Sequence, residues 1–171
     1  AERLWLIPAA VPESSIHRMP ADAVDLAAAA DAYAEELSGA LGRVAVLDLI
    51  LLGMGPDGHV ASLFPGHQLL TEHDRSVAAV SDAPKPPPRR LTLTLPVLTR
   101  ARSVVVAAFG APKAKALGQA LGDPASALPV AQVLRAASRA IVLADDPAGV
   151  ELRRAGSGNP YPGFAPSPTL P

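Results

Sequence analysis

The sequence contains no cysteine, and aromatic residues make up only 4% of it. Without cysteine the chain can form neither a disulfide framework nor a thiolate metal site, and it has no thiol nucleophile. The few aromatic side chains are not interleaved with basic ones, so no platform is present on which nucleic-acid bases could stack. These absences exclude disulfide-stabilised folds and cysteine-based active or metal sites, and they argue against a nucleic-acid partner.

Neither sign of charge is in excess, because 15 basic residues stand against 16 acidic ones. A general polyanion-binding surface would show a marked basic excess, whereas one small phosphorylated ligand needs only a few local cations. The apolar runs are much shorter than the roughly 20 residues that span a bilayer, and no basic segment followed by an apolar one opens the chain. We therefore expect a soluble, cytoplasmic protein with no membrane or nucleic-acid partner, and the sequence leaves an organellar location open.

The length of 171 residues is enough to bury one sizeable core and favours one domain, which we expect over residues 1–153. Residues 154–171 have the Pro/Gly/Ser-rich composition of an unfolded tail, and we expect them to be disordered. Because the first residue is Ala1 rather than a methionine, we also expect that the sequence starts inside a longer ancestral domain.

Periodic patterns predict the first helix and the first strand. We expect Asp22 to cap a helix whose apolar side chains recur every three or four residues over 26–41 and which ends at Gly42. Residues 46–52 are apolar apart from Asp48, which is typical of a strand buried on both faces of a parallel sheet.

The middle of the chain predicts two further strands. Residues 76–80 are a weaker strand candidate, and the proline-rich run 84–88 predicts a stiff, extended connection. Residues 90–95 alternate strictly, with three leucines on one face and one arginine and two threonines on the other. We expect this second face to be polar.

The C-terminal half alternates predicted strands and helices. We expect strands at 103–109 and 140–144, and helices that begin at Pro112, lie around 130–136 and cover 147–152. This alternation favours an α/β layer fold with a largely parallel sheet.

The most informative segment is a glycine-rich turn over residues 53–66, directly after the first predicted strand, which carries Asp57 and His59. Glycine permits positive φ and close approach to a ligand, and ligands bind beyond the carboxyl ends of parallel strands. His59 is a candidate general base that Asp57 would orient; alternatively, His59 is structural and Asp57 only stabilises the turn. The N–H groups around Gly53 and Gly55 are candidates to stabilise an oxyanion.

Two cations are candidate phosphate ligands. Lys113 follows Pro112 in the first turn of a predicted helix, where its charge opposes the helix dipole unless an anion is bound there. If the strands are parallel, Lys113 shares a sheet rim with His59. Arg90 opens an alternating strand on its polar face and can bind phosphate through two N–H groups. The alternative for each is a surface residue in contact with water.

The remaining basic candidates predict no metal centre. We expect Arg89 to lie along the leucine face of its strand with its charged end in water. His17, His67 and His73 show no spacing typical of metal ligands, so we expect no zinc site.

Taken together, these segments resemble the 6-phosphogluconolactonase family, whose members hydrolyse 6-phosphoglucono-δ-lactone to 6-phosphogluconate in the pentose phosphate pathway. The resemblance runs from about Ile16 to Leu152. It rests on three segments in order, namely residues 51–66, residues 81–96, and Gly110 with Lys113. It implies a doubly wound α/β fold with helices on both faces of a largely parallel sheet, shared with glucosamine-6-phosphate deaminases and ribose-5-phosphate isomerases.

The resemblance also implies roles for residues of the site. His59 matches the histidine regarded as the base that activates water, and Asp57 stands beside it as the orienting group. Arg90 and Lys113 match positions associated with the substrate phosphate. The resemblance implies no metal and no organic cofactor.

A deaminase is the nearest alternative within the superfamily. Deaminases resemble this turn as far as its Gly-His pair, but they carry a glutamate for proton transfer where this sequence has Phe64. Because a phenyl ring cannot transfer protons, the lactonase is favoured.

Two segments that members of the family carry are not found in this sequence. One is an N-terminal strand with a Gly-Gly-Ser/Thr-Pro type phosphate loop, and the other is a later Gly-Asp-Glu-Arg segment. We therefore expect a sheet that lacks its N-terminal strands. A second hypothesis follows, in which the chain is a catalytically impaired remnant that serves as a structural or interaction module. A protein partner, or the missing N-terminal segment, would then cover the open sheet edge.

Overall fold

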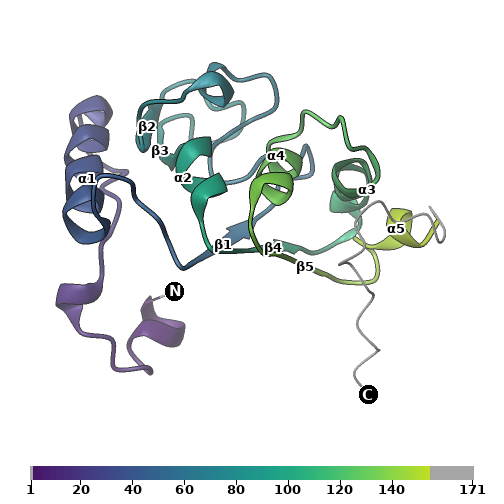
Figure 1. Cartoon of the computed structure of the whole chain (residues 1–171), viewed down its shortest axis with the longest axis horizontal. Coiled ribbons are helices and arrows are strands. Elements are labelled where there is room, and N and C mark those ends of the chain that lie inside the picture. The colour runs from purple at the N-terminus through teal and green to yellow at the C-terminus, as the bar shows by residue number, and fades with distance from the viewer. Residues whose placement is uncertain (1, 155–171) are drawn as a thin grey trace.

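The computed structural model describes residues 2–154 and has an α/β architecture (Figure 1). Within these residues a three-stranded parallel sheet has the order β1-β4-β5, and β2 and β3 form an antiparallel pair. The strands are β1 (Leu49–Gly53), β2 (Val77–Val80), β3 (Arg90–Leu93), β4 (Ser103–Ala108) and β5 (Ala140–Ala144). The helices are α1 (Leu26–Leu41), α2 (Leu95–Arg100), α3 (Ala114–Gly122), α4 (Pro129–Ala136) and α5 (Val150–Arg154). Short helical turns lie at Glu2–Leu6, Glu13–Ser15, Gln68–Thr71 and Ala111–Lys113. The predicted α/β class with a parallel sheet is confirmed.

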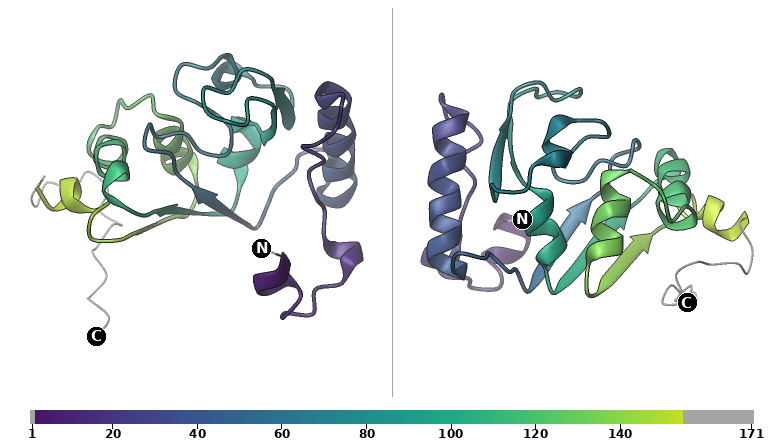
Figure 2. Two further views of the ribbon diagram at one scale, coloured as in Figure 1. Left: turned by 180° about the vertical axis from the view of Figure 1, so that it is seen from behind. Right: turned by 45° about the horizontal axis from the view of Figure 1, so that its top comes forward.

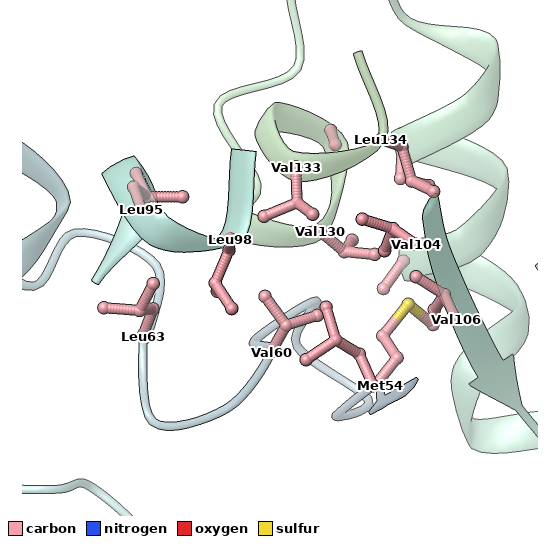
Figure 3. Packing of buried hydrophobic residues seen from close by; sticks show 14 of the residues in the cluster. Met54, Val60, Leu63, Leu95, Leu98, Val104, Val106, Val130, Val133 and Leu134 are labelled. Carbon is pink, nitrogen blue, oxygen red and sulfur yellow. The ribbon is translucent and has the colours of Figure 1, made fainter. Parts of the chain in front are cut away.

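The main core lies between the parallel sheet and helices α2, α3 and α4, which lie on one side of it (Figures 1 and 2). Figure 3 shows Val104 of β4, Leu98 of α2 and Val130 of α4 converging on Val60 and Met54, two residues that follow β1. All five side chains are buried. Because burial alternates along β4, every second residue of this strand faces the helices. The core therefore anchors the segment that carries the candidate site.

The other face of the parallel sheet is open among the described residues. Leu49 and Leu51 of β1 are 53% and 54% exposed, and Ile141 and Leu143 of β5 are also exposed. The prediction that the first strand is buried on both faces is therefore wrong. The physical reason is that α1 lies beside the β2–β3 pair, so the second helix layer of a doubly wound sheet is not seen over these leucines (Figure 1).

Helix α1 begins three residues later than predicted. Asp25, not Asp22, is its N-cap, because Asp25 Oδ1 accepts hydrogen bonds of 3.0 Å from the backbone N–H groups two and three residues on. The helix ends before Gly42, which has a φ of 84°, as predicted. A second, smaller core joins α1 to β2 and β3, with Leu26, Ala29, Ala30, Val77 and Leu91 buried in it.

The predicted polar face of residues 90–95 is wrong. Only the first four of these residues form β3, α2 begins two residues later, and Thr92 and Thr94 are buried. The Thr92 Oγ1 accepts a hydrogen bond of 3.1 Å from the backbone N–H of Ser62. The Thr94 Oγ1 donates to a backbone oxygen in the segment before β2. Because both hydroxyls have partners, they can be buried at little cost, and Thr92 ties the turn after β1 to the β2–β3 pair.

The other predicted elements agree with the structure to different degrees. The strands at 76–80, 103–109 and 140–144 and the helix at 130–136 are confirmed to within one residue at each end. Pro112 lies in the short turn before α3 rather than in α3 itself, and α5 starts later than the predicted helix at 147–152. The predicted tail lies outside the described residues, apart from Arg154 at the end of α5.

Candidate active site

The glycine-rich segment 53–66 forms a closed turn at the carboxyl end of β1. The Gly55 N–H donates to the His59 backbone oxygen at 2.9 Å, and the Gly58 N–H donates to the Gly55 oxygen at 3.0 Å. Gly58 has a φ of 81°, a conformation that other residues rarely adopt. Val60 is fully buried in the main core, so the turn has one fixed position relative to the sheet.

Asp57 and His59 contact each other across this turn. His59 Nδ1 lies 2.6 Å from Asp57 Oδ1, and the His59 side chain is only 18% exposed. An ionised carboxylate only accepts hydrogen bonds, so in the neutral imidazole the ring proton lies on Nδ1 and the Nε2 atom keeps a free lone pair. The structure thus brings the two predicted residues together in the geometry of an oriented general base.

Lys85 contacts the second oxygen of the same carboxylate, with its Nζ 2.9 Å from Asp57 Oδ2. Partial burial raises the pKa of Asp57, but the contacts with Lys85 and His59 lower it by more, so that the pKa falls from 3.8 to about 2. Asp57 is therefore ionised at neutral pH, as the assignment of the His59 proton requires.

The low pKa of Asp57 predicts a loss of stability in acid. A carboxyl group whose pKa is lowered by folding stabilises the fold above its unfolded pKa, and this contribution is lost as the pH falls to the folded value. For Asp57 the window runs from about pH 4 down to about pH 2. We expect Asp57→Asn to reduce the pH dependence of the unfolding free energy within this window, measured by urea denaturation at a series of pH values. Equal pH dependence in both proteins would contradict the prediction.

A cavity of about 780 Å³ lies beside the pair and is lined by His59, Lys85 and Lys113, together with residues of β1, its turn and β3. Lys113 Nζ donates to the Met54 backbone oxygen at 2.5 Å, which places Lys113 on the same sheet rim as His59. Because the Lys85 Nζ is buried and paired with Asp57, Lys113 is the ammonium group that, with the His59 imidazole, suits an anionic ligand here.

Gly53 and Gly55, the two glycines predicted to bind an oxyanion, both line the cavity, but only one of them has a backbone N–H that is not used within the turn or the sheet. The Gly55 N–H is used within the turn, where it donates to His59. The Gly53 N–H points away from β4, because alternate residues of a parallel strand bond to opposite sides. The Gly53 N–H is therefore the one that can bind a ligand. Gly55 has a different role, because a Cβ at this position would overlap the His59 ring, so only glycine leaves room for the ring.

Arg90 is not among the residues that line the cavity. Its Nε donates to the Pro87 oxygen at 2.9 Å, and one terminal nitrogen donates to the Lys85 and Pro86 oxygens at 2.8 and 3.1 Å. Its guanidinium carbon lies 5.4 Å from the centre of the Phe64 ring. Arg90 therefore holds the proline-rich loop, and this placement does not support the predicted phosphate contact.

The other basic candidates have structural partners. Arg89 is exposed, and its guanidinium donates to backbone oxygens just before α1. His17 contacts Glu36, and His67 contacts Asp82. Among residues 2–154, no group of three or more His, Asp or Glu side chains is placed to hold a metal ion. In the same part of the chain, no helix is long and apolar enough to cross a membrane.

Lys85 is the site residue that the sequence-based predictions missed. It lies within the proline-rich run 84–88, which the composition predicts only as a connection. A single charged residue between prolines was nevertheless an available signal, because a stiff backbone can hold one long side chain in a fixed direction.

A parallel sheet with an oriented histidine on the turn after β1 defines an α/β protein whose candidate ligand site lies at the carboxyl ends of its strands. The sequence model of the family described as glucosamine-6-phosphate isomerases/6-phosphogluconolactonase matches residues 1–142, so the chain belongs to this family. This match begins before Ile16, the residue at which the resemblance in the sequence starts.

Several relatives carry the name 6-phosphogluconolactonase. The rat protein is 54% identical over 107 residues, which cover 61% of this chain and 42% of the relative. The Mycobacterium tuberculosis protein is 46% identical over 135 residues, which cover 74% of this chain and 55% of the relative. The chain thus spans about half the length of the curated relatives it matches.

Solved structures of enzymes with the same name share the fold. The Trypanosoma brucei structure is 35% identical with a TM-score of 0.64, and the match covers 84% of this chain and 59% of that one. The Thermotoga maritima structure is 27% identical with a TM-score of 0.70, and the match covers 84% of this chain and 62% of that one.

Proposed function

We propose that this protein hydrolyses 6-phosphoglucono-δ-lactone to 6-phosphogluconate, a reaction of the pentose phosphate pathway. The observation that carries the proposal is the orientation of His59, whose Nδ1 is fixed by Asp57 while the ring lines a cavity that also contains two lysines. Membership of the family and the names of its relatives support the same substrate class.

In the proposed reaction His59 Nε2 takes a proton from a water molecule, and the water oxygen attacks the lactone carbonyl carbon. Asp57 stabilises the imidazolium that forms. The tetrahedral intermediate collapses with cleavage of the bond between the carbonyl carbon and the ring oxygen. That oxygen leaves as a hydroxyl after receiving the proton from His59, and the product is the open hydroxy acid.

Two further groups complete the proposed site. Lys113 binds the substrate phosphate, because the bond from its Nζ to Met54 leaves two of its three N–H groups for a ligand. The Gly53 N–H, which is not used by β4, stabilises the oxyanion of the intermediate. We do not include Arg90 or the Gly55 N–H among the substrate contacts, because each is engaged within the protein.

The deaminase alternative has less support at the site. Phe64 occupies the position of the deaminase glutamate, and its ring lies 4.6 Å from the His59 ring, where it can pack but cannot transfer a proton. A solved glucosamine-6-phosphate deaminase is similar at 24% identity, which supports the shared fold alone.

The proposal is tested by the rate of lactone hydrolysis above spontaneous opening. The substrates are freshly generated 6-phosphoglucono-δ-lactone and the same lactone without its phosphate. We expect the phosphorylated lactone to have a kcat/KM higher by roughly 30-fold or more, since one charge-assisted contact contributes about 2 kcal/mol. A folded protein with no rate above background for either lactone would overturn the proposed function.

We also keep the prediction of a cytoplasmic location. A rice relative, 53% identical over 76 residues, has a name that places it in the chloroplast. Fractionation of the producing cells would decide between the cytoplasm and an organelle.

A second candidate function is that of an interaction module, and the open face of the sheet favours it. Leu49 and Leu51 of β1 and Leu143 of β5 expose large apolar side chains, and the outer edge of β1 is unpaired within residues 2–154. A protein partner, or an N-terminal segment of the family type, would cover both features.

The second candidate predicts association through this face. We expect the 171-residue chain to form larger species as its concentration rises, measured by light scattering. Leu51→Lys should suppress this association and preserve the fold, because Leu51 is half exposed. Its neighbour Leu52 is buried, so the matched change Leu52→Lys should unfold the protein. A monomeric chain at all concentrations would remove the second candidate.

A further inference from the structure

The loop between β2 and β3 is fixed at several points. Besides the three bonds from Arg90 to its carbonyl oxygens, the Ala83 N–H donates to the Pro88 oxygen at 3.1 Å. His67 Nε2 also lies 3.0 Å from Asp82 Oδ1, which joins the loop to the short turn Gln68–Thr71. The backbone around Lys85 is therefore held in place on both sides of the residue.

From this fixed loop Lys85 reaches the turn after β1. Its Nζ atom is buried, and it contacts the Asp57 oxygen that His59 does not use. A carboxylate that is contacted at both oxygens has one orientation, whereas a carboxylate contacted at one oxygen can rotate about its side-chain bonds. Asp57 Oδ1 also accepts from the His59 backbone N–H at 3.5 Å, so the ion pair with Lys85 is the contact that holds the second carboxylate oxygen in place.

Arg90, at the end of the same loop, also reaches the His59 ring through an intermediate side chain, that of Phe64. The Arg90 guanidinium lies over the Phe64 ring at 5.4 Å, and the Phe64 ring lies 4.6 Å from the His59 ring. Arg90 also donates to the Lys85 backbone oxygen. The loop therefore connects to both Asp57 and His59, through Lys85 and through Phe64.

We infer that Lys85 is a positioning residue of the active site, which fixes the Asp57 carboxylate and through it the Nδ1–H tautomer of His59. This inference rests on the proposed function, because Lys85 is assigned the role of orienting His59, the general base of the proposed hydrolysis. Lys85 acts through Asp57 and takes no proton itself.

The competing role for Lys85 is a direct contact with the substrate phosphate, because the residue lines the same cavity. The two roles differ in their kinetics. A positioning residue affects the rate of the chemical step, whereas a residue that binds the substrate equally in ground and transition states affects KM.

The first test combines steady-state kinetics with a double-mutant cycle. We expect Lys85→Met to lower kcat about tenfold, with KM changed by less than about twofold, and Lys85→Arg to recover most of kcat. Lys85→Met combined with Asp57→Asn should be no slower than Asp57→Asn alone, because Lys85 acts only through Asp57. Lys115→Met, a change at an exposed lysine of α3, is the matched control and should leave kcat unchanged.

Two kinetic results would overturn the inference. One is a raised KM with unchanged kcat in Lys85→Met. The other is a kcat in the double variant that is reduced by the product of the two single reductions, those of Lys85→Met and Asp57→Asn. A loss of kcat that follows a loss of thermal stability, with no recovery in Lys85→Arg, would count against it in the same way.

The second test does not depend on turnover. The ¹⁵N chemical shifts of His59 report which ring nitrogen carries the proton, at a pH where the ring is neutral. We expect the Nδ1–H tautomer in the parent protein and in Lys115→Met, and a mixture of tautomers in Lys85→Met. Unchanged shifts in Lys85→Met would refute the positioning role, whereas an inactive parent protein with the expected shifts would refute only the proposed hydrolysis.

Discussion

Replacing His59 by alanine should lower kcat/KM for the phosphorylated lactone by about 10²- to 10⁴-fold, the range that a positioned general base contributes. The physical reason is that water is a poor nucleophile unless a group removes its proton as it attacks. His59 Nε2 is the group placed to do so, since Nδ1 is engaged with Asp57. The measurement is the initial rate of hydrolysis, corrected for spontaneous opening of the lactone.

The fold should tolerate this change. The His59 ring packs beside Phe64, but the turn is held by backbone hydrogen bonds and by buried Val60, which the substitution leaves in place. His73→Ala is the matched control, because His73 is exposed and lies outside the cavity lining. A His59→Ala protein that is folded and as active as its parent would remove His59 from the mechanism.

The second large effect is expected from Gly55→Ala, a change of one methyl group. A Cβ at position 55 would overlap Nδ1 and Cε1 of His59 and press against Asp57 Oδ1. The imidazole and the carboxylate would have to separate, because the backbone of the turn is closed by the bond from the Gly55 N–H to the His59 oxygen. We expect a loss of activity close to that of His59→Ala.

The matched control for this substitution is Gly39→Ala in helix α1. A Cβ at position 39 meets no atom within 4 Å, so the change should leave activity intact and stabilise the helix by roughly 0.5–1 kcal/mol. Thermal unfolding of both variants separates a local effect at the site from a general loss of fold. Full activity in Gly55→Ala would show that the contact between Asp57 and His59 is not required.

Local patterns were enough to predict most of the fold. Strands such as Ser103–Ala108 and Ala140–Ala144, and the helix Pro129–Ala136, are encoded by short runs of apolar residues, because burial on one face imposes the period of the element. Element ends were less predictable. Asp22 and Asp25 are both suitable N-cap residues, and which of them caps α1 depends on how the helix packs against the β2–β3 pair.

The centre of the candidate site was also predictable from sequence. Asp57 and His59 are two residues apart on a glycine-rich turn, so their contact is a local property of the chain. The positions of Arg90, Lys85 and the Gly55 N–H were not predictable in this way. The bonds of Arg90 to residues 85–87 and of the Gly55 N–H to His59 are local, but they depend on the backbone path of each loop, which residue types alone do not specify. Residues 57 and 85 meet only after the β2–β3 loop has folded back over the turn.

The sequence alone determined the family resemblance, the α/β class and the identity of the candidate base, because each of these depends on short segments of neighbouring residues. Only the tertiary structure decided that Lys85 contacts Asp57, that Arg90 supports a loop, and that Leu51 faces outward. The physical reason is that alternation along a strand separates its two faces but does not say what covers them. What covers a face, and which charge meets a carboxylate, depends on segments that are far apart in the chain.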